Sequence, residues 1–420
     1  MDEFAMGCGS TDGQISGPVI NPWSCKQLGG ARDYVIAGGS SGGSAAAVSA
    51  GLCLAAVASD TGGSARLPAA HCGVVGLKPT YGLLSRHGLI PLVNSLDVPA
   101  LIASCVSDVA ALLASWMNPK DQTARRMDAT CIPLSDNQLS IFHHGLTAIA
   151  THCACEGQSS RLRIGIPVEY HAPGLTQEIA QVWDEVASCL DDGELDCTVQ
   201  QVRLPHTPMA TTVYSVLCAA EVASNMARYD GLKYGYRAQP STEWVDNGAS
   251  GDGEQQLSSV EAMFAATRSH GFGDVVRGRV LAGNFFLLTS QRDCHLDAAR
   301  RLWRLIKQDF DEVFDQVDFL LTPTTLGPPT RLTDFVQLDS RTRCTMDDVC
   351  TVGANLAGVP AVSIPVCLSS STGLPIGLQL IGPALSEVGL LRLAAHIESM
   401  VAFPSLVDMI GLLDQLRTSS

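Results

Sequence analysis

The 420-residue chain has little positive charge. Its 27 lysines and arginines stand against 42 aspartates and glutamates, which gives a formal net charge of −15 at pH 7. Direct binding to nucleic acid needs clustered cations that contact phosphates. This composition therefore argues against a protein that binds nucleic acid unaided. It leaves open an RNA-related role that is carried out through a partner.

Long apolar runs and metal-binding cysteine pairs are also lacking. The best candidate for a membrane span, residues 45–58, contains Ser49 and Cys53 and is about one turn shorter than most spanning helices. We therefore expect no membrane association. Among the 15 cysteines, Cys153 and Cys155 form C-x-C, but no C-x-x-C pair could seed a zinc site. We expect buried free thiols and no bound metal.

Apolar residues make up 46% of the chain and charged residues 16%, so the sequence is neither disordered nor of low complexity. Apolar, β-branched runs predict strands, and apolar residues that recur every three or four positions predict helices. The expected strands are residues 34–37, 73–82 with a turn, 163–167, 317–322 and 361–366. The expected helices are residues 45–58, 177–190, 219–227, 275–288 and 390–401.

This mixture of strands and helices, without internal repeats, predicts an α/β fold in which helices cover a mixed sheet. We expect one domain over residues 1–420. Residues 118–160 have a mixed, largely polar composition and are predicted to be a surface insertion. The stretch from 246 to 256 is too rich in glycine to hold a helix, and residues 248–256 are predicted to be a second surface insertion.

Two glycine- and serine-rich clusters carry the clearest chemical signal. They are Gly38-Gly39-Ser40-Ser41-Gly42-Gly43-Ser44 and Asp60-Thr61-Gly62-Gly63-Ser64, with Ser40 and Ser64 24 residues apart. A nucleophilic serine needs an exposed hydroxyl, a proton acceptor and N–H donors aimed at the developing oxyanion. The glycines before Ser64 leave the backbone uncluttered, so consecutive N–H groups of Thr61, Gly62 and Gly63 can point at one oxygen.

Two other interpretations of these clusters stay open at this point. Glycine-rich turns often bind phosphate, although neither cluster fits G-x-x-x-x-G-K-[ST] or G-x-G-x-x-G. Residues 39–43 also satisfy G-x-S-x-G, the nucleophile elbow of α/β-hydrolases, with Ser41 at its centre. That interpretation leaves the second cluster without a role.

The order and spacing of three segments resemble the amidase signature family. They are the two clusters, the second continued through Ala65-Arg66, and Gly76-Leu77-Lys78-Pro79-Thr80-Tyr81-Gly82. The resemblance implies a mixed central sheet covered on both faces by helices, and a Ser–cisSer–Lys catalytic unit. In that unit Ser64 is the nucleophile and Ser40, held by a non-proline cis peptide, is the bridging serine. By the same resemblance, Ser41 and Arg66 support the bridge through hydrogen bonds.

The third member of that unit is a neutral lysine that lies upstream of the bridging serine. Lys26 is the only lysine before Ser40, and it stands in a loop with no matching motif. Lys78 matches the family's structural Lys-Pro turn and is not a candidate for the base. We therefore expect that an amino-terminal segment with the lysine is missing from this chain, and that the chain is inactive without it.

A finer resemblance points to one branch of the family. Residues 1–7, 85–90, 224–231 and 355–360 are similar to the A subunits that hydrolyse glutamine for glutamyl-tRNA(Gln) amidotransferases, mitochondrial type. The resemblance implies that B and C subunits are partners and that tRNA is contacted through a partner. It implies the mitochondrial matrix as the location, with the cytoplasm as the alternative. It implies no cofactor in this chain, because the ATP and magnesium of the complex are expected at the B subunit.

Glutamine itself sets requirements for its site. Its α-carboxylate suits an arginine and its α-ammonium suits a carboxylate. The resemblance places these at Arg279 and Asp348, with Tyr214 beside the substrate; Arg277 and Asp347 are nearby rivals. Two alternatives remain, which are a stand-alone amidase for fatty or aryl amides and a non-catalytic scaffold subunit.

Overall fold

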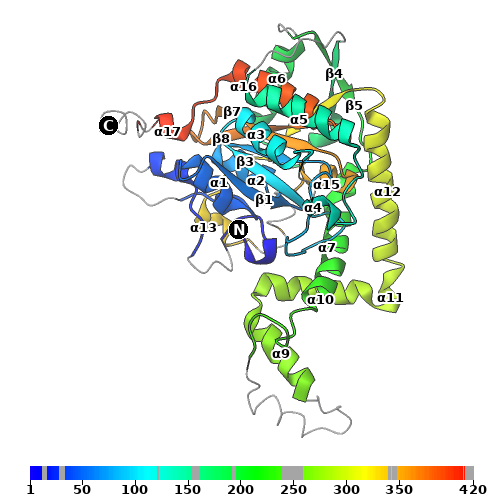
Figure 1. Ribbon diagram of the computed structural model, residues 1–420. Helices are drawn as coiled ribbons and strands as arrows, with labels where there is room; N and C mark the ends of the chain where they lie inside the picture. Colours follow the sequence, from blue (N-terminus) through cyan, green and yellow to red (C-terminus); the bar gives the residue numbers. More distant parts are fainter. Residues whose placement is uncertain are drawn as a thin grey trace.

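The structure is a computed structural model that describes residues 1–11, 17–27, 34–120, 123–152, 161–191, 195–238, 259–338, 342, 348–409 and 411 (Figure 1). Within this part of the chain, eight strands form one sheet in the order β1-β3-β2-β7-β8-β6-β4-β5. The pairs β4–β5 and β4–β6 are parallel and the other pairs are antiparallel. The strands are β1 (Ala55–Asp60), β2 (Val75–Lys78), β3 (Val98–Ala103), β4 (Leu162–Pro167), β5 (Cys197–Val202), β6 (Phe319–Pro323), β7 (Ala361–Leu368) and β8 (Pro375–Ile381).

Helices cover both faces of this sheet, as Figure 1 shows. Along β3, Ala100 and Ile102 pack with the helices α1 and α2, whereas Leu101 and Ala103 pack with α3 and α16. Alternate side chains of a strand point to opposite faces, so these two pairs of residues lie on opposite faces of the sheet, and each face is covered by helices at β3. The mixed α/β fold is thereby confirmed. The helices are α1 (Gly42–Ser49), α2 (Arg66–Cys72), α3 (Val106–Trp116), α4 (Thr123–Arg126), α5 (Asp136–Ala150), α6 (Gln177–Asp191), α7 (Ala210–Met226), α9 (Ser259–Gly271), α10 (Asp274–Leu287), α11 (Thr289–Arg292), α12 (Leu296–Val313), α13 (Leu332–Phe335), α15 (Val352–Ala357), α16 (Glu387–Val401) and α17 (Leu406–Met409).

The single helix expected over residues 45–58 is wrong. The helix α1 ends at Ser49, and Gly51 adopts a left-handed conformation with φ of +69°. The chain then enters β1, whose Ala55 pairs with Ala103 of β3. The alanine-rich composition favours a helix, but pairing with β3 overrides that local preference. The expected strand over residues 34–37 is reduced to isolated bridges at Val35 and Ile36.

Residues 118–160, expected as a surface insertion, contribute to the core. The segment 136–150 is the helix α5, which begins with a capping box between Ser135 and Gln138. Its side chains Leu139 and Phe142, with Leu146 and Ile149, are buried in the main core against α3. Their helical spacing marks an amphipathic helix. Residues 153–160, with both cysteines of the C-x-C pair, lie outside the described residues.

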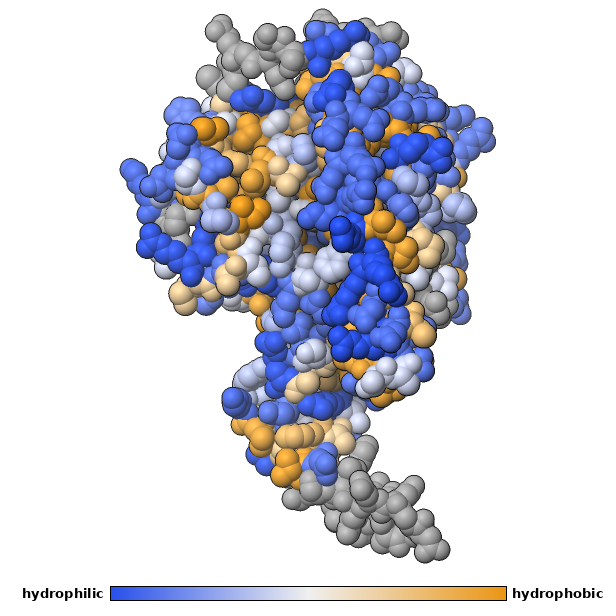
Figure 2. Space-filling model, turned by 90° about the vertical axis from the view of Figure 1, so that its right-hand side faces the viewer, coloured by the Kyte–Doolittle hydropathy of each residue, from blue (hydrophilic) through white to orange (hydrophobic). Residues whose placement is uncertain are grey.

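A layer of helices beside the sheet positions the candidate site. The helices α7 and α10 cross closely, because a β-carbon at Gly283 of α10 would lie 1.9 Å from the carbonyl oxygen of Ala219 of α7. The helix α12 packs against α7 and α15 on its inner side. Figure 2, in which the right-hand side of Figure 1 faces the viewer, shows a hydrophilic band down this face.

The stretch from 246 to 256 lies outside the described residues.

The carboxyl-terminal helices form an apolar segment. Residues Glu387–Met409 are long and apolar enough to cross a membrane, by length and composition. In the structure, however, Leu390, Leu391 and Ile397 of α16 are fully buried in the main core. The helix lies against β7, α3 and α5, which is the environment of a core helix.

Candidate active site

The loop between β1 and α2, residues 60–64, holds the predicted nucleophile and is called the Ser64 loop below. Ser64 is partly exposed, whereas Thr61, Gly62 and Gly63 are buried. Gly63 has φ of +146°, and a β-carbon there would lie 2.2 Å from Oγ1 of Thr351. Only glycine fits this position without strain. The loop can therefore bring its backbone close to neighbouring groups.

Side chains from two other segments hold the Ser64 loop in place. Thr61 Oγ1 donates a hydrogen bond of 2.8 Å to Oδ1 of Asp97, which immediately precedes β3. Thr351 Oγ1, just before α15, donates a hydrogen bond of 2.7 Å to the carbonyl oxygen of Gly62. Both anchors are buried, so water does not compete for these bonds.

The other cluster, residues 38–44, is called the Ser40 loop and lies next to the Ser64 loop. The backbone N–H of Ser41 donates a hydrogen bond of 3.1 Å to the carbonyl oxygen of Ser64. The peptide bond between Gly39 and Ser40 is cis, which confirms the geometry that the family resemblance implies. Oγ of Ser40 is fully buried and has no hydrogen-bond partner among the described residues.

Ser41 has a supporting geometry and lacks that of an exposed nucleophile. Its side chain is fully buried, and its Oγ donates to the carbonyl oxygen of Ser59 at 3.3 Å. The same Oγ accepts the N–H of Ser59 at 3.4 Å. Ser41 is thus bound to β1 directly before the Ser64 loop, and a nucleophile elbow centred on it would need an accessible hydroxyl.

A buried ion pair lies beneath the Ser64 loop. Arg66 and Asp60 are both fully buried and 2.9 Å apart. Burial by itself raises the pKa of Asp60, but the charge and hydrogen bonds of Arg66 outweigh this and lower the pKa to about 2. Arg66 also donates to the carbonyl oxygen of Thr351 and to Gln379 Oε1, both at 3.0 Å. The pair ties the start of α2 to the core.

No lysine in the described part of the chain contacts Oγ of Ser40. Lys78 is buried, and its Nζ donates to the carbonyl oxygens of Pro79 and Val359. Burial lowers the pKa of Lys78 to about 7, but its amine joins the turn after β2 to Val359, which lies just before β7. The side chain of Lys26 lies outside the described residues.

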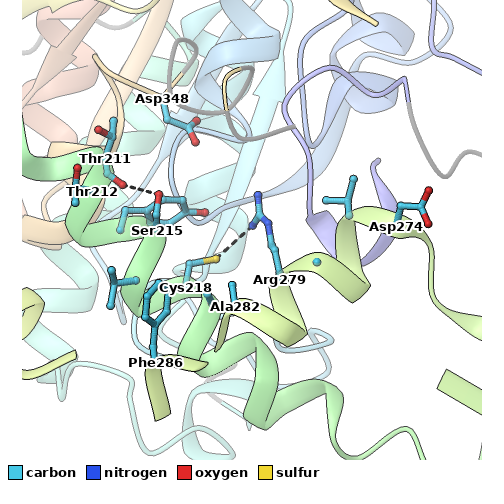
Figure 3. A pocket seen from close by; sticks show the side chains of 14 residues that line it. Thr211, Thr212, Ser215, Cys218, Asp274, Arg279, Ala282, Phe286 and Asp348 are labelled. Carbon is cyan, nitrogen blue, oxygen red and sulfur yellow. Dashed lines mark hydrogen bonds between the residues drawn. The ribbon is translucent and has the colours of Figure 1, made fainter. Parts of the chain in front are cut away.

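A pocket of about 490 Å³ lies between α7 and α10 (Figure 3). It brings together Tyr214, Arg279 and Asp348, the three residues predicted to contact the substrate. Figure 3 shows the guanidinium group of Arg279 reaching from α10 toward α7, where Nη1 donates a hydrogen bond of 3.3 Å to Sγ of Cys218. An arginine and an aspartate on one cavity can receive a carboxylate and an ammonium group.

This pocket adjoins the Ser64 loop. A β-carbon at Gly62 would lie 2.9 Å from Cζ of Tyr214, so the tyrosine ring rests against the backbone of the loop. The turn that carries Asp348 is joined to the same loop, because Thr351 donates to Gly62 and its own N–H binds the carbonyl oxygen of Asp348 at 3.2 Å. The part of the pocket wall formed by Tyr214 and the Asp348 turn is thus continuous with the Ser64 loop.

Arg277 and Asp347 are the alternatives to Arg279 and Asp348 that the sequence left open. Arg277 forms an exposed ion pair with Asp274 and, unlike Arg279, is not among the residues that line the pocket. Asp347 lies outside the described residues. Every cysteine whose side chain the structure describes is a free thiol, and Cys8, Cys72, Cys197, Cys218 and Cys350 are buried. Across the same residues, no group of three or more histidine, cysteine, aspartate or glutamate side chains could hold a metal ion.

Sequence reasoning missed four of the residues that shape this site. Asp60 belongs to the cluster 60–64 but was given no role of its own. Thr351 lies just before the segment 355–360. Gln379 and Asp97 stand in no motif. Their roles depend on contacts across the fold, such as the bond between Asp97 and Thr61, which are 36 residues apart.

The comparisons with known proteins agree with this geometry. The amidase family model matches residues 1–391. The chain is 47% identical over 421 residues to the A subunit of the mitochondrial glutamyl-tRNA(Gln) amidotransferase of Xenopus tropicalis, covering 97% of this chain and 73% of that protein. The human counterpart is 47% identical over 417 residues, covering 96% and 72%.

Solved structures give the same result. The A subunit of the glutamyl-tRNA(Gln) amidotransferase of Thermotoga maritima superposes with a TM-score of 0.66 at 30% identity, covering 95% of this chain and 71% of that one. A crystal structure of an amidase, at 24% identity, shares the fold with a TM-score of 0.65 over 96% and 73% of the chains. The chain therefore belongs to the amidase family, in the branch that contains the mitochondrial glutamyl-tRNA(Gln) amidotransferase A subunits.

Proposed function

We propose that this chain is the glutamine-hydrolysing subunit of a mitochondrial glutamyl-tRNA(Gln) amidotransferase. The observation that carries the proposal is the pocket in which Arg279 and Asp348 lie on one cavity beside the Ser64 loop. Their charges suit the α-carboxylate and α-ammonium of free glutamine. A fatty or aryl amide, by contrast, presents neither group.

The proposed reaction is acyl transfer to Ser64. Its Oγ attacks the γ-carbonyl carbon of glutamine, and the proton of that hydroxyl passes to Oγ of Ser40 and from there to a base. The N–H groups of Thr61, Gly62 and Gly63 stabilise the negative oxygen that develops. The protonated base returns this proton through Oγ of Ser40 to the amide nitrogen, the C–N bond breaks, and ammonia leaves. Water then hydrolyses the ester to glutamate and frees Ser64.

The base in this proposal is a neutral lysine amine that reaches Oγ of Ser40. The support is that this oxygen is fully buried and has no hydrogen-bond partner among the described residues, although buried hydroxyls normally have one. Lys78 is excluded, because its amine is bound to the carbonyl oxygens of Pro79 and Val359. The lysine comes from outside the described part.

The partners in this proposal take the ammonia onward. A B subunit, with ATP and magnesium, amidates glutamyl-tRNA(Gln), and a C subunit completes the complex. The formal charge of −15 suits a subunit that leaves the RNA phosphates to its partner. The names of the relatives support the mitochondrion as its location.

The test is a glutaminase assay on this chain and on the longest product of its transcript, each with its partner subunits. Activity on glutamine that is lost in Ser64→Ala supports the proposal, and activity in the longer product alone places the base outside this chain. Activity on lipid amides alone would identify a stand-alone amidase. Assembly of the complex without activity in either product would identify a scaffold.

A further inference from the structure

A buried carboxylate outside the predicted catalytic set is bound to the Ser64 loop. Asp97 is 2% exposed, and its Oδ1 accepts the hydroxyl hydrogen of Thr61 at 2.8 Å. Its Oδ2 accepts the backbone N–H groups of Leu92 and Val93, both at 2.9 Å. Each carboxylate oxygen thus holds a different segment, and Asp97 joins them rigidly.

The segment from 92 to 97 is in turn fixed to α7, the helix that carries Tyr214. Glu221 accepts hydrogen bonds from both the backbone N–H and the hydroxyl group of Ser95. Asn225 Nδ2 donates a hydrogen bond of 2.9 Å to the carbonyl oxygen of Leu92. A continuous set of hydrogen bonds therefore leads from α7 through Asp97 to Thr61.

We propose that Asp97 is a positioning residue for the oxyanion donors. By holding the Thr61 hydroxyl, it fixes the direction of the N–H groups of the Ser64 loop relative to α7, the helix that carries Tyr214. Asp97 touches no reacting atom and acts through Thr61. This inference rests on the proposed acyl transfer at Ser64, and it adds a residue that the Gly/Ser motifs do not contain.

The physical reason lies in how the loop is otherwise held. Gly62 and Gly63 have no side chains to fix them, and Gly63 adopts φ of +146°. Of the residues from Asp60 to Ser64, only Thr61 donates a side-chain hydrogen bond to the carboxylate of Asp97. Oxyanion donors act only when they are aimed in advance at the position of the developing charge. Loss of this bond removes one of the two side-chain anchors described above, Thr351 being the other, so the N–H groups of the glycines can shift away from the developing charge.

A matched pair of variants tests this on the active complex. Thr61→Val keeps the shape of the side chain and removes the hydroxyl, whereas Thr61→Ser keeps the hydroxyl and removes a methyl group. We expect Thr61→Val to lower kcat on the order of tenfold to a hundredfold, the cost of a small misplacement of catalytic groups, with KM for glutamine within about threefold. Thr61→Ser recovers most of that loss.

Substitutions of Asp97 give a second test of the inference. Asp97→Ala removes all three hydrogen bonds of the carboxylate and lowers kcat as Thr61→Val does. Asp97→Asn can turn its amide toward Thr61 and keep the link, so it recovers part of the loss. In the double variant Thr61→Val with Asp97→Ala, the effects on kcat are not additive, because both changes remove one interaction. Melting temperatures and titration of active sites identify any variant that merely fails to fold.

Two results overturn the inference. One is equal kcat in folded Thr61→Val and Thr61→Ser, and the other is a loss confined to KM or to the fraction of folded protein. If wild type hydrolyses no glutamine, the proposed function fails, but the positioning can still be measured. The rate at which phenylmethanesulfonyl fluoride modifies Ser64 depends on the same N–H donors, and it should fall in Thr61→Val and recover in Thr61→Ser.

Discussion

Replacement of Arg66 by methionine tests the buried ion pair between Arg66 and Asp60 beneath the Ser64 loop. All donors of the guanidinium group are used: Nε and Nη2 bind Asp60, Nη1 binds Gln379 and the carbonyl oxygen of Thr351, and Nη2 also binds Asn355. Methionine fills a similar volume but leaves Asp60 buried without its cation. Breaking a buried pair in this way costs about 3–5 kcal/mol of the free energy of unfolding.

The pKa of Asp60 gives an independent figure for the same interaction. The fold lowers it from 3.8 to about 2, and each unit corresponds to about 1.4 kcal/mol. The lowered pKa therefore contributes about 2 to 3 kcal/mol at neutral pH. Because the folded pKa is the lower one, this stability is present above about pH 4 and is lost as the pH falls toward 2. The difference between wild type and Arg66→Met should shrink over that range.

The assay is urea unfolding followed by tryptophan fluorescence at pH 7 and again at lower pH. Arg66→Lys is the control, because it keeps the charge but cannot supply the forked set of donors. We expect an intermediate loss for it. A loss below about 1 kcal/mol for Arg66→Met, or a difference from wild type that stays constant with pH, would refute the reasoning.

Three further predictions concern the pocket, the loop and a titrating carboxylate. Arg279→Lys and Asp348→Asn should each weaken glutamine binding, measured by calorimetry, on the order of tenfold to a hundredfold; unchanged affinity would remove both from the substrate site. Gly63→Ala should slow sulfonylation of the nucleophilic serine at least about tenfold, because its β-carbon would meet a threonine side chain at 2.2 Å. The control Gly88→Ala also replaces a glycine of positive φ, but in open space, so an equal effect would show that clash is not the cause. Burial raises the pKa of Asp97 from 3.8 to about 6, so wild type should lose up to about 3 kcal/mol relative to Asp97→Asn as the pH rises from about 4 to 6; a difference that does not vary with pH would contradict this.

The strands that could be predicted from sequence are those whose local pattern and tertiary environment agree. Residues 317–322 and 361–366 are predicted strands because they are apolar and contain β-branched residues, and both fall largely within strands of the sheet. Residues 55–58 are the opposite case. Their alanines favour a helix, and only the partner strand β3, whose Val98–Ala103 lie far along the chain, makes them a strand.

The residues of the site also fall into two groups, those that a local sequence pattern marks and those that it does not. The Ser40 and Ser64 loops could be located because glycine and serine cluster in sequence wherever backbone must approach a reacting group closely. The cis peptide bond before Ser40 was expected and is present. The anchors could not be found, because Asp97 and Thr351 reach the Ser64 loop from distant segments and no local pattern marks them.

The acyl-enzyme itself gives the most direct test of the account. The active complex is mixed with glutamine and quenched in acid within the first turnover, and its peptides are analysed by mass spectrometry. We expect a glutamyl ester on the peptide that contains Ser64, and none in Ser64→Ala. A glutamyl group on any other residue, or turnover of glutamine with Ser64 unmodified and dispensable, would contradict the account.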